Sequence, residues 1–412
     1  MTYEACIEYL FAQLPMFHRT GPAAYKPGIG NIIALCELLG HPERDLKFVH
    51  IAGTNGKGST SHLIASALQE AGYTTGLHTS PHLIDFRERI RVNGALIPKE
   101  TVVEFVITYR EKWQSIQPSF FELSVAMAFW YFRREGTDIC VIETGLGGRL
   151  DSTNIIAPEV CAITTIGLDH MNLLGDTPGQ IAFEKAGIIK SGVPVVIGAI
   201  QGDAREVILQ KATESGAEVI DSTLLQDTPV AALKGNYQKA NAGTAHAVLH
   251  ALIARGWNIS PQHIADGFAR VIENTGLAGR WQEIRQNPKV ICDVGHNADG
   301  VGLVVEQVNR MEKVQLHIVL GMVSDKDIGN VLRLLPQDAT YYFCKADIPR
   351  GMDAVQLQEQ ASVSGLLGEA YPSVAAAYRA ALDAAAEQDL VLVTGSFFTV
   401  GEVLTEAGVT IG

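Results

Sequence analysis

A glycine-rich loop with one lysine and two hydroxyls stands near the start of the chain. It consists of Gly53, Thr54, Asn55, Gly56, Lys57, Gly58, Ser59 and Thr60, and it follows an apolar run at residues 48–52. Glycines let several backbone N–H groups face one point, and a helix beginning near Ser59 would add the positive end of its dipole. Lys57 would supply a fixed charge, while Ser59 or Thr60 could offer an oxygen to Mg²⁺. These residue types predict a site for nucleotide phosphates, and the lysine favours ATP over NAD.

The spacing of this loop differs from the common P-loop. The usual pattern has a further glycine, with four residues between it and the Gly-Lys pair, but Ile51 occupies that position here. Gly58 also separates Lys57 from the two hydroxyls. An ordinary turn between a strand and a helix is the alternative interpretation. The composition of the loop still favours phosphate binding, and its spacing is unusual.

Three further side chains could take part in chemistry beside a nucleotide. Glu143 ends an apolar run, where a carboxylate could bind Mg²⁺, although alone it would more often be a solvated or capping acid. His170 lies on a turn after the next run and could serve a second metal, but a lone histidine is usually structural. Lys185 shares a helical face with apolar residues, so burial could make its amine nucleophilic. A surface lysine whose stem covers apolar residues is the commoner interpretation of Lys185.

Apolar runs that resemble strands alternate with helical periods along the chain, which is the pattern of an α/β fold. We expect strands at residues 48–52, 139–143, 160–166, 193–197, 290–293, 315–321, 339–343 and 390–394. Ligands bind at the carboxyl ends of strands in open parallel sheets. Those ends carry the loop at 53–60, Glu143, the turn at 167–170 and residues 293–297. The sequence therefore predicts one site at these strand ends.

The length of 412 residues favours two domains. The Gln-Asn-Pro run at residues 286–288 interrupts the periodicity, and a new strand follows it. We expect residues 1–284 to form a mostly parallel, P-loop-type sheet flanked by helices. Residues 289–412 would then form a smaller Rossmann-like α/β domain, with the boundary near residues 285–289 and the site at the seam.

Composition narrows the classes of partner. A formal net charge of −13 argues against nucleic acid, which needs a basic surface. No apolar run is long enough to span a membrane, and the first residues do not resemble a signal peptide, so we expect a cytoplasmic protein. The six cysteines have no paired spacing, which predicts reduced core residues and not disulfides or zinc ligands.

Eleven segments, in this order along the chain, resemble the folylpolyglutamate synthase and dihydrofolate synthase family. They are residues 53–60, 79–83, 88–90, 121–122, 143–154, 168–170, 184–188, 279–281, 293–297, 325–327 and 395–396. This family belongs to the Mur-ligase-like synthetases, which form amide bonds. The resemblance spans nearly the whole chain, so it is more specific than any single motif.

The resemblance implies a role for each matching position. Ser80, Glu143 and His170 match magnesium ligands, and Lys185 matches a lysine that CO₂ converts to a carbamate, an anionic oxygen donor for a second Mg²⁺ or for substrate. The loop at 53–59 would hold ATP phosphates, and Asn241, Arg280 and Asp293 match positions that bind ATP. His296 would position phosphate or the incoming amino acid. The pterin site would be lined by Ser119, Phe120, Phe121, Glu122, Leu150, Asp151 and Ser152, although Asp151 and Ser152 could also cap the next element.

The implied reaction is ATP-dependent ligation of a carboxylate to the amine of L-glutamate through an acyl phosphate. Lys57, Arg280 and two Mg²⁺ ions would offset the charge of the phosphates. We expect a monomer that acts on both dihydropteroate and (poly)glutamylated folates. Residues 21–30 depart from the family, which commonly has an arginine there, so Tyr25 or Lys26 could take over that contact.

Two alternatives predict other features. A cell-wall Mur ligase usually carries about a hundred residues more before the phosphate loop, the size of a small domain, whereas 52 residues precede Gly53 here. An ATP-binding regulatory protein without catalysis would have no use for Lys185, His170 or Glu122.

Overall fold

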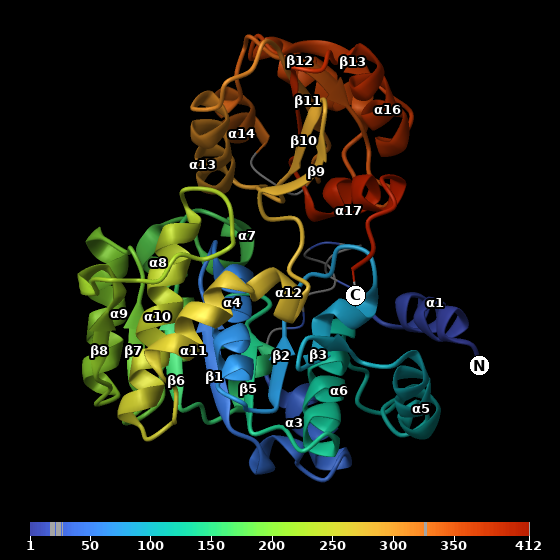
Figure 1. Cartoon of the computed structure of the whole chain (residues 1–412). Coiled ribbons are helices and arrows are strands. Elements are labelled where there is room, and N and C mark those ends of the chain that lie inside the picture. Colours follow the sequence, from blue (N-terminus) through green and yellow to red (C-terminus); the bar gives the residue numbers. More distant parts are fainter. Residues whose placement is uncertain (17–20, 22–25, 27, 325–327, 412) are drawn as a thin grey trace.

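Two sheets organise the computed structural model, which describes residues 1–16, 21, 26, 28–324 and 328–411 (Figure 1). The first sheet contains β1 (Phe48–Ala52), β2 (Thr75–His78), β3 (Ile90–Val92), β4 (Ala95–Leu96), β5 (Ile139–Glu143), β6 (Val160–Ile163), β7 (Val195–Ile197) and β8 (Val219–Asp221). Its eight strands are ordered β4-β3-β2-β5-β1-β6-β7-β8, and only β3 and β4 are antiparallel to their neighbours.

The second sheet forms the smaller domain, which stands above the first in Figure 1. It contains β9 (Gln282–Gln286), β10 (Lys289–Cys292), β11 (Leu316–Leu320), β12 (Thr340–Phe343), β13 (Leu367–Ala370) and β14 (Leu390–Thr394). The order is β13-β12-β11-β14-β10-β9, in which only β9 is antiparallel. The predicted fold class, a parallel P-loop-type domain with a smaller Rossmann-like domain, is confirmed.

Helices cover both faces of each sheet. Those of the first domain are α1 (Tyr3–Gln13), α3 (Gly30–Leu38), α4 (Lys57–Glu70), α5 (Lys99–Tyr109), α6 (Phe120–Arg134), α7 (Met171–Leu174), α8 (Pro178–Ala186), α9 (Gly202–Glu214), α10 (Gln238–Ala254), α11 (Pro261–Ala269) and α12 (Val271–Thr275). Those of the second are α13 (Ala298–Asn309), α14 (Ile328–Leu334), α15 (Ala354–Val363), α16 (Val374–Ala384) and α17 (Phe397–Glu406). Short 3₁₀ turns lie at Pro42–Asp45, Phe86–Arg89, Ser152–Ile155 and Ser222–Leu224.

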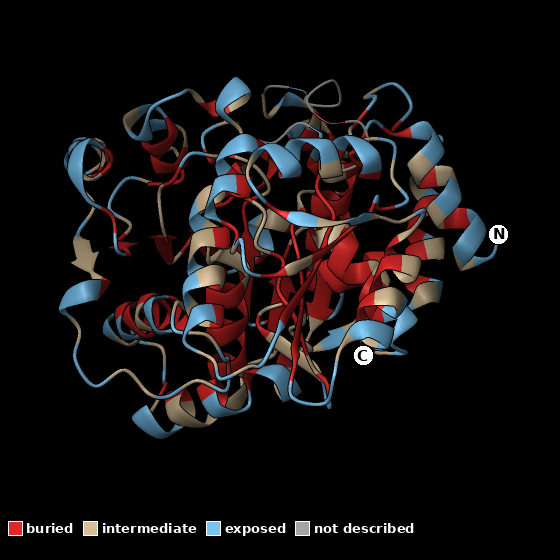
Figure 2. Cartoon of the chain, turned by 90° about the horizontal axis from the view of Figure 1, so that it is seen from above, coloured by how far each residue is buried: buried red, intermediate tan, exposed pale blue. Residues whose placement is uncertain are grey.

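The central strand β1 shows why this sheet needs helices on both sides. All five of its residues are buried, as expected for a parallel strand between two helical layers. Val49 and Ile51 pack into the core with α4, α10 and α11, whereas Phe48 packs on the opposite side with α3 and α6. Figure 2 shows the same arrangement, with buried strands inside and exposed residues on the outer helices. The carboxyl end of β1 is therefore held rigidly, and the glycine-rich loop leaves from it.

Comparison with the predicted strands shows where sequence patterns fail. All eight expected strands are present, and those at 48–52, 139–143 and 390–394 have the predicted bounds. The strands β2, β3, β4, β8, β9 and β13 were not predicted. Apart from β9 they have two to four residues, and β9 and β13 are edge strands without a buried residue. Such strands lack the buried apolar run that makes central strands recognisable.

The predicted boundary near residues 285–289 needs correction. Those residues form the end of β9, the start of β10 and the turn between them, and β9 already pairs with β10 in the second sheet. We therefore propose that the division lies between Thr275, where α12 ends, and Gln282, where β9 begins.

Two predictions about the chain as a whole can be compared with the structure. All six cysteines are buried and unpaired, as expected for reduced core residues. Within the described ranges, no helix combines the length and the apolar character that crossing a bilayer requires. The family segment at 325–327 and position 25 lie outside the described residues.

Candidate active site

A cavity of about 470 Å³ lies at the seam between the two domains. Its walls come from the segments that follow β1, β5 and β6 in the first domain and β10 and β14 in the second. It is lined by Gly53, Thr54, Asn55, Gly56, Lys57, Gly58, Ser59, Ser80, Ser119, Phe120, Phe121, Glu122, Glu143, Leu150, Asp151, Ser152, His170, Lys185, Asn241, Arg280, Asp293 and His296, among others. Among the predicted site residues that the structure describes, Thr60 alone is missing from this wall, because it is buried within α4.

The glycine-rich loop is packed too tightly for side chains at two of its positions. A Cβ on Gly53 would overlap the Thr164 hydroxyl, and one on Gly56 would overlap the Asn241 side chain. Gly56 also has a φ of 87°, which allows it to stand at the N-cap of α4. The helix consequently begins at Lys57 and not near Ser59 as predicted.

Lys57 lies across its own loop. Its Nζ donates hydrogen bonds to the carbonyls of Gly53, at 3.0 Å, and Thr54, at 3.1 Å. The amino end of α4 and a lysine charge therefore meet at the same place, which is the arrangement that binds phosphate.

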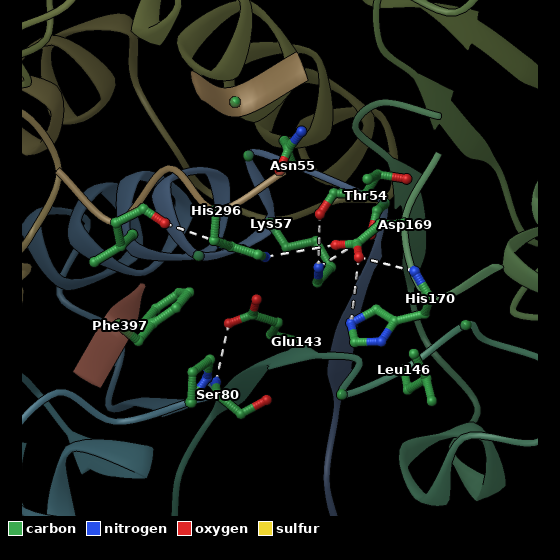
Figure 3. A pocket seen from close by; sticks show the side chains of 18 of the residues that line it. Thr54, Asn55, Lys57, Ser80, Glu143, Leu146, Asp169, His170, His296 and Phe397 are labelled. Atoms are coloured by element: carbon green, nitrogen blue, oxygen red, sulfur yellow. Dashed lines mark hydrogen bonds and ion pairs between the residues drawn. The ribbon is translucent and has the colours of Figure 1, made fainter. Parts of the chain in front are cut away.

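Glu143 is buried at the end of β5, next to Ser80 (Figure 3). One carboxylate oxygen accepts a hydrogen bond from the Ser80 N–H at 3.1 Å. Burial raises the pKa of Glu143, and the positive charges of Lys57 and Arg280 oppose that rise. A buried carboxylate in a cavity that a serine also lines is a suitable donor for a cation that prefers oxygen.

His170 lies on another wall of the cavity, at the start of α7. Its Nε2 is 3.8 Å from Asp169 Oδ1, and Asp169 Oδ2 is 3.5 Å from Nε2 of His296, which comes from the second domain (Figure 3). In the part of the chain that the structure describes, no three His, Cys, Asp or Glu side chains converge into a metal-binding group. A cation here would thus complete its shell with water or phosphate, as Mg²⁺ commonly does.

Lys185 is not a surface lysine. It is 4% exposed on α8, it lines the cavity, and its Nζ donates a hydrogen bond to the Gly53 carbonyl at 2.8 Å. Lys185 and Lys57 therefore meet at the same carbonyl oxygen of the glycine-rich loop. The interpretation as a lysine that covers apolar surface is wrong, because the side chain points inward.

The segment Ser119 to Glu122 is a capping box that starts α6. The Ser119 hydroxyl accepts from the Glu122 N–H at 3.2 Å, and Glu122 accepts from the Ser119 N–H at 2.6 Å. Glu122 also accepts a hydrogen bond from Asn31 at 3.2 Å. The Glu122 carboxylate therefore stabilises the start of α6. This helix start places the aromatic pair Phe120 and Phe121 in the cavity wall.

Asp151 has a capping role as well as a place in the cavity wall. One of its oxygens accepts from the N–H groups of Gly145 and Leu146, at 2.9 and 2.8 Å, and the other accepts from the Thr153 N–H and hydroxyl, at 2.9 and 2.6 Å. Burial raises the pKa of Asp151, and these hydrogen bonds oppose that rise. The capping interpretation is confirmed, and Asp151 orders the loop that follows β5.

Asp293 of the second domain and Arg280, from the segment between the domains, contribute a carboxylate and a cation to the same cavity. Asp293 accepts hydrogen bonds from the Trp281 N–H at 2.8 Å, the Gly295 N–H at 2.9 Å and the Tyr237 hydroxyl. The guanidinium of Arg280 lies 4.9 Å from the centre of the Phe397 ring, and its Nη2 is 3.5 Å from where a Cβ on Gly58 would stand. Arg280 therefore reaches the phosphate loop of the first domain.

Asn297 links the domains directly. Its amide exchanges two hydrogen bonds with Asn55 of the phosphate loop, both at 3.1 Å, and donates a third to Asp169 at 3.1 Å. Its oxygen also caps α13 by accepting from the Gly300 N–H at 2.9 Å. Asn297 was not predicted as a site residue, although an asparagine just before a helix is a recognisable N-cap.

Other residues of the cavity wall were not predicted either. These are chiefly Asp169, Tyr237, Arg350 and Phe397. Arg350 stands in a polar loop without a motif, so nothing in the sequence marks it. Asp169 lies beside His170 in a segment that the sequence singled out, and its neighbour was chosen instead.

A substitution at Gly145 tests whether Phe121, in the aromatic part of the cavity wall, contacts the substrate. A Cβ at this position would lie 2.5 Å from Phe121 Cζ, so Gly145→Ala must displace that ring. The family resemblance implies a pterin substrate against this wall, so we expect the KM for that substrate to rise several-fold, while the KM for ATP stays close to wild type. Steady-state kinetics with each substrate varied in turn measures both. Gly329→Ala is the control, because this glycine lies within α14 and no atom lies within 4 Å of its Cβ position. Equal rises in both KM values for Gly145→Ala would show that the wall does not serve the pterin.

The two domains and the phosphate loop at their seam define an ATP-dependent ligase of the Mur type. Residues 51–259 match the Mur ligase middle domain, and residues 279–397 match the Mur ligase, glutamate ligase domain. The chain is 34% identical to the dihydrofolate synthase/folylpolyglutamate synthase of Bacillus subtilis, over 92% of this chain and 94% of that protein. It belongs to the folylpolyglutamate synthase/dihydrofolate synthase family, and it is a ligase that attaches glutamate to folates.

Other relatives agree with this assignment. A probable bifunctional folylpolyglutamate synthase/dihydropteroate synthase of Haloferax volcanii is 34% identical over 98% of this chain, which spans 50% of that longer protein. The structure of Escherichia coli FolC in complex with DHPP and ADP superposes with a TM-score of 0.86, at 31% identity and over 98% of this chain and 97% of that chain. A bifunctional folylpolyglutamate synthase/dihydrofolate synthase with Mn, AMPPNP and L-glutamate bound gives a TM-score of 0.84, at 30% identity and over 98% of both chains.

Proposed function

We propose that this ligase joins L-glutamate both to dihydropteroate and to (poly)glutamylated folates through an acyl phosphate. The observation that carries the proposal is the cavity of about 470 Å³ at the seam. It brings the phosphate loop, Glu143 and Lys185 of the first domain together with His296 of the second and with Arg280 from the segment between them. A carboxylate, a polyphosphate and an amine could meet there away from bulk water.

The chemistry follows from the poor leaving group of a carboxylate. An oxygen of the substrate carboxylate attacks the γ-phosphorus of ATP, the bond to the β-phosphate oxygen breaks, and ADP leaves. The neutral amine of glutamate then attacks the acyl carbon, loses a proton, and expels inorganic phosphate as the amide forms. The protein contributes mainly positioning and neutralisation of charge, through the loop N–H groups, Lys57 and Arg280.

Magnesium fits the residues at this site. Ser80, Glu143 and His170 would hold it, since Glu143 is a buried carboxylate that accepts from the Ser80 N–H, and all three residues line the same cavity. When bound, Mg²⁺ neutralises phosphate charge. The similar structure that contains AMPPNP and L-glutamate also contains Mn, and we infer two Mg²⁺ ions for the present enzyme.

We further propose that CO₂ carbamylates Lys185. In that step the neutral Nζ attacks the carbon of CO₂, forms an N–C bond, and loses a proton to leave an anionic carbamate. The buried amine at the cavity wall, 2.8 Å from the Gly53 carbonyl, has the position this role needs. The carbamate would act like a long carboxylate and could help to hold the second cation or the substrate carboxyl group.

The pterin would lie against Phe120, Phe121 and Leu150, since a flat aromatic ring is recognised well by an apolar wall with a few polar groups. Lys26 lines the same cavity and donates to the Gln117 carbonyl at 2.5 Å. It comes from the segment that departs from the family, and it is our candidate for the anion contact there.

We infer a monomer that acts in the cytoplasm on small molecules, without a nucleic-acid or membrane partner.

Phosphate release tests the proposed substrates. The protein is incubated with ATP, Mg²⁺, bicarbonate and L-glutamate, and either dihydropteroate or tetrahydrofolate is added. We expect each to accelerate phosphate release and to gain one glutamate by mass spectrometry, with no product when glutamate is omitted. Turnover of only one of them would refute the dual activity, and turnover of neither would refute the proposed function.

A further inference from the structure

Two histidines face each other on the part of α10 that lies outside the cavity wall. His246 and His250 are separated by one helical turn, so their side chains share a face. Their Nε2 atoms are 3.0 Å apart, the ring centres are 4.5 Å apart, and the ring planes meet at 71°. In this structure one Nε2–H donates a hydrogen bond to the other Nε2, so the two rings hold the same nitrogen side by side.

A metal ion bound by both rings could keep this separation, taking the place of the hydrogen bond between them. Two imidazole nitrogens that each lie about 2.1 Å from a metal and bind it at a right angle are about 3.0 Å apart. We propose that His246 and His250 form a binding site for a divalent transition metal that binds imidazoles at right angles, such as Ni²⁺ or Cu²⁺. The site is distinct from the magnesium site of the ligase reaction, because neither histidine lines the cavity.

The surroundings of His246 support this role. Its Nδ1 lies 3.4 Å from the Thr228 hydroxyl, so an N–H at Nδ1 can donate there and leave the lone pair of Nε2 directed at His250. Histidines that bind metals usually have such a partner on their other nitrogen, which fixes the ring and its tautomer. The carboxylate of Asp227 acts on the same ring, and its negative charge would favour a cation nearby.

The exposure of the two histidines and the number of protein ligands determine how the metal ion would bind. His246 is 7% exposed and therefore held in place, whereas His250 is exposed and leaves the site open to solvent. Among the described residues, no third His, Cys, Asp or Glu completes the group. Water would fill the other positions, so we expect one reversibly bound ion. Such an ion binds the folded helix in preference to the unfolded chain and would raise the stability of the native state.

The test uses the full chain, stripped of metal with a chelator, and Ni²⁺ as the probe. Isothermal titration calorimetry counts the ions bound, and thermal unfolding measures the rise in Tm. We expect His250→Gln to bind one Ni²⁺ fewer than wild type and to lose the associated rise in Tm. Because His170 and His296 could also hold Ni²⁺ in the cavity, the difference between variants is the informative quantity.

His263→Gln is the matched control. His263 belongs to the capping box of α11, where glutamine can take the same role, so this variant removes a histidine without removing the cap. We expect it to bind as many Ni²⁺ ions as wild type. His246→Gln is a second arm, and it should lose the same ion as His250→Gln. Equal Ni²⁺ binding by wild type and His250→Gln, or an equal loss in His263→Gln, would overturn the proposal, and neither result depends on the ligase reaction.

Discussion

Lys185→Ala should lower kcat by about 10²–10³-fold, the scale seen when one preorganised electrostatic contact is removed from an active site. The expectation rests on the proposed carbamate and on the position of the amine, which is buried in the cavity wall and hydrogen-bonded to Gly53. Removing it would leave the phosphates and the substrate carboxyl group without the anion that helps to hold their cation. Phosphate release at saturating ATP, glutamate and folate measures the change.

Two further measurements separate a carbamate from a simple positive charge. Acetate or another short carboxylate should restore part of the activity of Lys185→Ala, because it can occupy the space of the carbamate. Lys185→Arg keeps the charge but cannot form the carbamate, so we expect it to be as impaired as the alanine variant. Substantial activity in Lys185→Arg would indicate that the charge is what matters, and turnover like wild type in Lys185→Ala would remove Lys185 from the mechanism.

The second large effect is expected at Asn297, the residue that joins the domains. Asn297→Asp keeps the oxygen that caps α13 but loses the donor that bonds to Asn55 and Asp169, and it places a negative charge beside Asp169. We expect a fall in kcat/KM for ATP of about 10²-fold, because a small displacement of reacting groups can cost that much. Steady-state kinetics with ATP varied measures the effect, and thermal unfolding checks that the fold persists.

Comparison with two other variants shows whether Asn297 acts through the phosphate loop. Asn297→Ala removes the cap too, so its free energy of unfolding should fall by about 1 kcal/mol more than that of Asn297→Asp. In a double-mutant cycle, Asn55→Ala should add little to the kinetic defect of Asn297→Asp, since both break the same contact. Fully additive defects, or wild-type kinetics in Asn297→Asp, would show that the amide pair does not position the loop.

Much of the candidate site could be predicted because its signals are local. The glycines and the lysine of residues 53–60 stand together in the sequence, and a buried strand such as β5 is recognisable from its apolar run and ends in Glu143. Since parallel strands end at one edge of a sheet, these segments had to lie near one another. The edge strands without a buried residue and the start of the second sheet at Gln282 lacked such a signal and were missed.

The sequence by itself determined the fold class, the phosphate loop and the strand ends that carry the site, because each depends on neighbouring residues and on the periodicity of burial. Only the tertiary structure decided whether Lys185 points outward or into the cavity, and only it placed Asn297 against Asn55. The physical reason is that these facts are distances between side chains. They depend on how helices pack on the sheet and how two domains meet, which residue types and spacing along the chain do not specify.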